Sequence, residues 1–271
     1  YAAVKISDGC DRGCAFCAIP KFRGAFRSLG IDEVQAECVA LVEQGVRELC
    51  LVSQDTNRFG GDVDRFLDLL ESLENVAGIE WVRPLYLYPD PRTEQLLRGV
   101  ADRGLKKFAP YLESPVQHVS PRVLKSMRRY GGFEIFRDLF ALARELVPGL
   151  EIRTSLLLGF PTEEPEDVDL VLRFLEEVRP EKLALFAYSQ EEETSGFALG
   201  DPVAEGEKTE RVNLVRAAHL EILKEIHTER IGRRYRCMVD ALRPGEVLAR
   251  RGQDAPAIGG RIFLEGAAAG L

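Results

Sequence analysis

Three of the six cysteines of this 271-residue chain lie close together, in the segment CDRGCAFC. They are Cys10, Cys14 and Cys17, at spacings of four and three residues. Gly9 precedes the first and Gly13 precedes the second, and glycines at these positions favour a loop over a helix with a cysteine stripe. The pattern therefore predicts a loop that carries three thiols.

Three thiols can serve as a disulfide network, a zinc site or an iron–sulfur site. A disulfide network is not expected in a cytoplasmic protein. Structural zinc takes four ligands, and the three histidines of the chain, at positions 118, 219 and 227, are distant in sequence. A cubane held by four thiolates is a closed electron carrier. With three, one iron stays open to a small molecule, so we favour a catalytic [4Fe-4S] cluster; a non-catalytic protein that binds structural zinc or RNA is an alternative.

Apolar runs typical of strands buried on both faces recur along the chain. They are AAVKIS, ELCLVS, WVRPLYLY, KFAPYLES, EIRTSLLLG and KLALFAYS. Between them lie helical patterns, such as 32–44 and 62–73. Strands that alternate with helices form a parallel sheet. Six units are fewer than the eight of a closed barrel, so we predict an α/β fold of the partial (β/α)6 barrel type.

The pattern changes after a long surface helix predicted over 205–230. Short alternating strands with Pro-Gly and Gly-Gly breaks follow it and indicate an all-β module that is itself incomplete. We predict two domains, a barrel over 1–228 and a β-rich module over 229–271. Residues 232–271 contain seven arginines and four acidic residues, whereas the whole chain has a net charge of -8. This acidic balance argues against a protein that coats nucleic acid nonspecifically.

Polar residues follow the carboxyl ends of several predicted strands, where barrels of this kind carry their reactive groups. The cysteine loop, Gln54-Asp55, Gln117-His118 and the turn at Gly159 are all placed this way. We expect these groups to converge over one mouth.

Structural alternatives exist for several of these side chains. Gln54 and Asp55 could cap the following turn, and His118 could be a hydrogen-bonded loop histidine. Arg153 interrupts an apolar strand and needs a partner, either a cofactor carboxylate or a structural ion pair. Solvated charges are expected at Arg23 and Arg27. The other three cysteines, at 38, 50 and 237, are interpreted as small core residues.

Six segments, taken in order, resemble those of the radical S-adenosylmethionine (SAM) methylthiotransferases over nearly the whole chain. The segments are KISDGCDRGCAFCAIPKFRG, LVSQDTNRFGGD, LYLYPD, PVQHVSPRVLKSMRR, LLLGFPTEE and FAYSQEE. The first contains C-x-x-x-C-x-x-C with Phe16 before the last cysteine, which is the signature of radical SAM enzymes. Gln54-Asp55-Thr56, Tyr88-Pro89 and Asp254-Ala255-Pro256 resemble the RimO branch, which modifies a ribosomal protein. The branch that acts on transfer RNA is the second possibility.

The resemblance implies a specific chemistry. Cys10, Cys14 and Cys17 would hold the cluster, and the methionine part of SAM would bind its open iron. The residues expected to contact the cofactor are Phe16, Gln54, Gln117, Arg153 and Gly159. Reduction would release a 5′-deoxyadenosyl radical that takes hydrogen from the β-carbon of an aspartate in a small-subunit ribosomal protein, where a methylthio group is then attached. In the family a second [4Fe-4S] cluster, held by an N-terminal domain, takes part in the sulfur transfer.

The resemblance also implies partners. These are the ribosomal protein and an electron donor such as flavodoxin or ferredoxin. The tail resembles the start of a TRAM domain, a module through which nucleic acid could bind. The chain begins at Tyr1 within a strand-like run, so we expect it to be a piece of a longer polypeptide that lacks the second-cluster domain. Neither a signal peptide nor a membrane-spanning run is visible, and we expect a cytoplasmic protein without a membrane partner.

Overall fold

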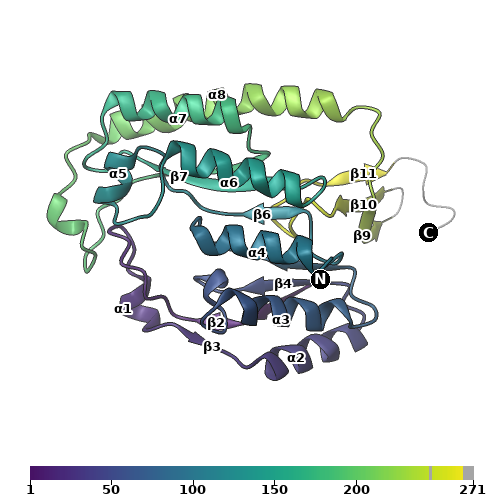
Figure 1. The fold of residues 1–271 in the computed structure, drawn as a ribbon. Coiled ribbons are helices and arrows are strands. Elements are labelled where there is room, and N and C mark those ends of the chain that lie inside the picture. The colour runs from purple at the N-terminus through teal and green to yellow at the C-terminus, as the bar shows by residue number, and fades with distance from the viewer. Residues whose placement is uncertain (244–245, 265–271) are drawn as a thin grey trace.

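The computed structural model describes residues 1–243 and 246–264 and shows parallel strands behind a row of helices (Figure 1). Six strands run parallel in chain order, in two sheets of three, β1-β4-β5 and β6-β7-β8. A parallel bridge from Val82 to Phe108 joins the two halves. The strands are β1 Ala2–Lys5, β4 Glu48–Val52, β5 Trp81–Pro84, β6 Tyr111–Glu113, β7 Glu151–Leu158 and β8 Lys182–Ala187. The predicted partial barrel of six βα units is confirmed.

Helices stack side by side in chain order along the sheet (Figure 1). The long ones are α2 Ile31–Glu43, α3 Val63–Glu74, α4 Pro91–Asp102, α6 Phe133–Leu146, α7 Pro165–Val178 and α8 Glu205–Arg230. Short helices are α1 Ile19–Arg23 and α5 Pro121–Ser126, with 3-10 turns η1 Thr56–Arg58 and η2 Phe197–Leu199. No helix among the described residues has both the length and the apolarity that a bilayer crossing requires.

Helix α3 shows how the sequence pattern becomes structure. Asp62 caps it by accepting the N–H of Arg65 at 2.8 Å, which satisfies one of the free donors of the first turn. Phe66, Leu69 and Leu73 recur at helical spacing and are all buried. They enter the core between helices and sheet, so the helical pattern predicted over 62–73 is confirmed.

Strand β8 corrects one prediction. Its residues are only half-buried or exposed, and Phe186 is 53% exposed. The run KLALFAYS is as apolar as a central strand, but β8 pairs on one side only, with β7. An open sheet leaves its terminal strands without a neighbour, and a linear pattern does not reveal which strand is last.

The C-terminal module is a three-stranded antiparallel sheet in the order β11-β10-β9. Its strands are β9 Cys237–Arg243, β10 Glu246–Arg251 and β11 Ile262–Leu264.

The predictions made for this part of the chain have different outcomes. Helix α8 ends at Arg230. The predicted domain boundary at residue 228 stays a prediction. Cys237 is partly exposed, not in a core, whereas Cys38 and Cys50 are buried as expected. Part of the predicted module, residues 244–245 and 265–271, lies outside the described residues.

Buried ion pairs attach this small sheet to the amino-terminal ends of the barrel strands. Glu48, the first residue of β4, contacts both Arg83 of β5 and Arg250 of β10, and all three are buried. Glu151, the first residue of β7, accepts from Arg251 at 2.9 Å and from Lys182 at 2.7 Å. Because a buried charge without a partner is costly, these pairs fix where the sheet docks.

Asp254 belongs to the same network, and its titration provides a test. Burial raises its pKa, but Arg251 and Lys182 outweigh burial and lower the pKa from 3.8 to about 2. A carboxylate with a lowered pKa contributes stability above its unfolded value, which is lost as the pH falls through the folded value. Asp254→Asn should therefore cost roughly 2 kcal/mol of unfolding free energy at pH 7 and progressively less from pH 5 to pH 2.

Urea unfolding across this pH range measures the difference. Asp64→Asn is the matched control, because the Asp64 side chain is 88% exposed and its change should stay within about 0.5 kcal/mol. A pH-independent effect of Asp254→Asn would contradict the electrostatic explanation.

Candidate active site

The cysteine loop leaves the sheet at the carboxyl end of β1. It is shaped by a small hairpin of β2 Ser7–Asp8 and β3 Arg27–Ser28. Gly9 adopts φ +76°, and a Cβ there would lie 2.3 Å from the carbonyl oxygen of Ala25, so only glycine fits. The N–H of Cys10 donates to the carbonyl of Gly24 at 3.2 Å, and that of Cys17 donates to Cys14 at 3.2 Å. These contacts fold the loop back on itself.

Ala15, between the cysteines, ties the loop to two distant segments. Its N–H donates to the carbonyl of Met127, after α5, at 2.9 Å, and its carbonyl accepts from Gly196 at 2.6 Å. Ala15 is 2% exposed, whereas the three cysteines around it are each partly exposed. The loop is held by its backbone at this point while its thiols remain accessible.

Arg12 anchors the loop to the ends of two strands. Its guanidinium donates to Asp55 at 2.6 Å and to Asp90 at 2.8 Å. It also stacks on Tyr88, 3.5 Å from the ring centroid. Burial opposes the charge, but the two carboxylates outweigh it and raise the pKa of Arg12. Asp55 makes no side-chain cap, so the capping alternative is wrong for this residue.

Arg129 reaches the same loop from the other side. Its Nη1 donates to Sγ of Cys14 at 3.3 Å, and its Nη2 donates to the carbonyl of Pro115 at 2.5 Å. Burial raises the pKa values of Cys10 and Cys17, and the neighbouring thiols raise them further, since thiolates gathered without a metal repel one another. Iron bound by these thiols would supply the positive charge that removes this cost.

Sequence reasoning missed Arg12, Tyr88, Asp90 and Arg129. A usable signal was present, because each lies within a segment quoted for the family resemblance. What the pattern lacked was any indication that the side chains meet across the barrel.

Three of the predicted cofactor residues, Gln54, Gln117 and Gly159, follow the carboxyl ends of β4, β6 and β7, at the mouth of the barrel, whereas Arg153 is the third residue of β7. Gln117 has φ +70°. Its backbone extends the sheet beside β7, and its carbonyl oxygen accepts the N–H of Leu157 at 2.7 Å. Gly159 has φ +75° and donates to Glu163 at 2.9 Å. Gln54 is half-buried, and its Oε1 is buried without a hydrogen-bond partner. Phe16 packs partly buried against the core.

The alternatives for two residues are present in the structure. Arg153 donates to Glu113 at 3.0 Å, the ion pair considered for it, and burial raises the pKa of Glu113. His118 is fully buried, and its Nδ1 accepts the N–H groups of Val119 and Ser120 at 2.9 and 3.0 Å. Arg23 and Arg27 are exposed, as expected.

Comparison with known proteins decides the family. The family model described as the Radical SAM superfamily matches residues 4–175. The chain belongs to the radical SAM superfamily. Among solved structures, the radical SAM methyltransferase TsrM of Kitasatospora setae matches 69% of this chain and 34% of its own, with a TM-score of 0.57 at 18% identity. Coproporphyrinogen III oxidase HemN of Escherichia coli matches 84% and 51%, with a TM-score of 0.54 at 18% identity. At such identity these structures support the fold alone.

Two curated relatives are much more similar in sequence. A protein of Leptospira biflexa serovar Patoc named ribosomal protein uS12 methylthiotransferase RimO is 50% identical over 98% of this chain and 59% of the relative. A protein of Aquifex aeolicus with the same name is 40% identical over 98% of this chain and 62% of the relative. The chain thus spans about 60% of the length of these relatives.

The cysteine loop fits the cluster that a radical SAM enzyme uses. Within the described residues, no three His, Cys, Asp or Glu side chains are grouped as ligands of a single metal ion. A cubane does not require such a group, because each thiolate binds a different iron atom. The three free thiols, their partial exposure and the backbone anchors around them suit ligands of this kind.

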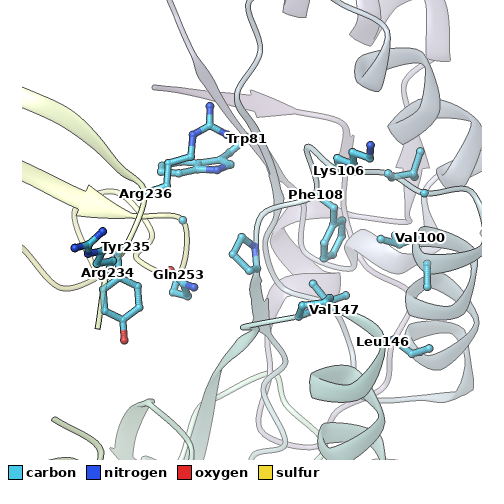
Figure 2. A pocket seen from close by; sticks show the side chains of 16 residues that line it. Trp81, Val100, Lys106, Phe108, Leu146, Val147, Arg234, Tyr235, Arg236 and Gln253 are labelled. Carbon is cyan, nitrogen blue, oxygen red and sulfur yellow. The ribbon is translucent and has the colours of Figure 1, made fainter. Parts of the chain in front are cut away.

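A cavity of about 600 Å³ lies at the opposite end of the barrel (Figure 2). Figure 2 shows Arg234, Tyr235 and Gln253 of the C-terminal module across from Phe108 and Val147 of the barrel. Trp81, the first residue of β5, also lines it, which places it at the amino-terminal ends of the strands. It contains none of the residues of the cysteine loop, so it is separate from the candidate active site.

The conformation of Gly9 is testable. Gly9→Ala should lower the unfolding free energy by at least about 2 kcal/mol, because the new Cβ collides with backbone atoms and the positive φ is strained. Gly13→Ala, in the same loop, has no atom within 4 Å of the added Cβ and should change stability by less than about 0.5 kcal/mol. Urea unfolding compares the two variants, and equal effects would refute the steric argument.

Proposed function

We propose that this chain is the radical-generating part of a methylthiotransferase that adds a methylthio group to the β-carbon of an aspartate in a small-subunit ribosomal protein. The observation that carries the proposal is the 50% identity, over nearly the whole chain, to a protein named ribosomal protein uS12 methylthiotransferase RimO. Because the chain spans about 60% of that relative, the complete reaction belongs to the longer protein.

We propose Cys10, Cys14 and Cys17 as the three protein ligands of a [4Fe-4S] cluster whose fourth iron takes SAM. When bound, these groups supply one-electron cleavage of a carbon–sulfur bond, which yields a radical that removes hydrogen from unactivated carbon. The chain positions and shields them. Arg12 holds the loop through Asp55 and Asp90, and buried Ala15 fixes the segment between the thiols.

The mouth residues support the cofactor assignment. Gln54 offers a buried carboxamide oxygen without a hydrogen-bond partner, and an acceptor of this kind suits a hydroxyl or amino donor of the cofactor. Gly159 and Gln117 both have positive φ, and a Cβ at Gly159 would lie 2.5 Å from the Lys208 side chain, so a glycine is required at this turn. The roles of Phe16 and Arg153 in binding SAM stay predictions.

Partners follow from the same proposal. A one-electron donor such as flavodoxin or ferredoxin is required, and the ribosomal substrate places the reaction in the cytoplasm. The exposed Arg233, Arg234 and Arg236, just before the C-terminal sheet, offer a surface for RNA or for an acidic protein patch near the substrate. In the longer protein, a second [4Fe-4S] cluster would take part in sulfur transfer.

The cluster assignment is tested with Cys14→Ala. Anaerobic reconstitution of the wild-type chain should give about four irons with acid-labile sulfide, and dithionite with SAM should release 5′-deoxyadenosine. Cys14→Ala should lose most of the cluster and at least about 90% of that release. Cys237→Ala, which removes a partly exposed cysteine of the C-terminal sheet, should retain both. A single zinc per wild-type chain would refute the assignment.

The substrate is tested with the full-length protein. Methylthiolation of isolated ribosomal protein and of transfer RNA is compared by mass spectrometry under the same reducing conditions. We expect a mass increase on one aspartate of the ribosomal protein and none on RNA. Product found only on transfer RNA would replace the proposed substrate without affecting the cluster.

A further inference from the structure

Arg129 places a guanidinium against the proposed cluster loop. Its Nη1 lies 3.3 Å from Sγ of Cys14 and its Nη2 lies 2.5 Å from the carbonyl oxygen of Pro115. Its Nε is buried without a hydrogen-bond partner. One terminal nitrogen of the guanidinium is therefore directed to the sulfur of Cys14, a proposed cluster ligand, while the other is hydrogen-bonded to the backbone at Pro115.

The backbone around Arg129 makes this position rigid. Arg129 follows the short helix α5, and its N–H donates to the carbonyl of Leu124 at 2.8 Å. Met127, two residues earlier, accepts the N–H of Ala15 at 2.9 Å, so the same turn holds the cysteine loop. Any movement of this turn would shift both the guanidinium and the loop together.

Tyr88 separates two arginines that differ in their charge balance. Arg12 stacks 3.5 Å from the ring centroid and Arg129 lies 4.4 Å from it. Arg12 is neutralised by Asp55 and Asp90, whereas in the part of the chain that the structure describes no ion pair joins Arg129 to a carboxylate. Arg129 therefore contributes a net positive charge directly beside Cys14.

We propose that Arg129 tunes the reduction potential of the cluster through Cys14. Reduction adds one electron, supplied by an external one-electron donor, and makes the cluster more negative. A nearby cation and a hydrogen bond to a ligand sulfur stabilise the reduced form more than the oxidised form, which raises the potential. In a half-buried site this interaction is weakly screened.

The proposal rests on the cluster and not on sulfur transfer, so it can fail while the proposed function stands. A structural role for Arg129 is the competing explanation, since it also holds Pro115. The two differ in one observable. A structural role changes how much cluster is bound, whereas tuning changes the potential of a fully loaded cluster.

The experiment is a redox titration of the reconstituted chain, followed by electron paramagnetic resonance of the reduced cluster and normalised to iron and sulfide content. In Arg129→Met the ratio of reduced to oxidised cluster at a fixed potential should fall about tenfold, a midpoint about 59 mV lower for a one-electron couple. Arg129→Lys keeps the charge and should lie closer to wild type. Arg128→Met is the matched control, because the neighbouring Arg128 is exposed and its removal should leave the midpoint unchanged.

Each outcome decides the proposal. A fully loaded Arg129→Met with an unchanged or raised midpoint overturns it, and so does an equal shift in Arg128→Met. Should Arg129→Met bind no cluster, Arg129→Gln, which keeps a donor for Pro115, is titrated instead against the same expectation. Loss of the cluster in both neutral variants assigns Arg129 to loop structure and also overturns the proposal.

Discussion

The ion pairs between Arg12 and two carboxylates, Asp55 and Asp90, are the constraint on which the site depends. They connect the cysteine loop to the ends of β4 and β5, with a buried carboxylate that would be costly if left alone. Between Cys10 and Cys17 the apolar side chains are the small Ala15 and the partly buried Phe16, so little apolar surface is available for packing. Ion pairs therefore hold this loop in place, whereas hydrophobic packing holds the helices.

Paired or stacked arginines occur at both ends of the barrel, partly buried at one end and buried at the other. At the carboxyl ends of the strands, Arg12 and Arg129 flank Tyr88 beside the thiols. At the amino-terminal ends, Arg83, Arg250 and Arg251 attach the C-terminal sheet through Glu48 and Glu151. Asp254, part of a segment that resembles the RimO branch, belongs to this second network. Its burial far from the thiols gives it an architectural role within this chain.

Much of the fold and part of the site could be predicted from the sequence. The six strand runs, the stripe on α3 and the span of α8 depend on local periodicity, which a linear pattern records directly. The exposure of β8 and of Cys237 could not be predicted, because it depends on which strands and helices pack beside them. The pairing of Arg129 with Cys14 joins residues far apart in sequence, for which the chain gives no local signal.

The sequence by itself was enough to predict a cluster, because three thiols at spacings of four and three lie within a glycine-bearing loop and the family segments surround them. Only the tertiary structure decided the environment of those thiols. Which charges lie beside Cys14, which are neutralised and which carboxylate holds Arg12 depend on side chains brought together from separate strand ends. Electrostatic interaction depends on distance in space, and distance in space is a property of the folded chain.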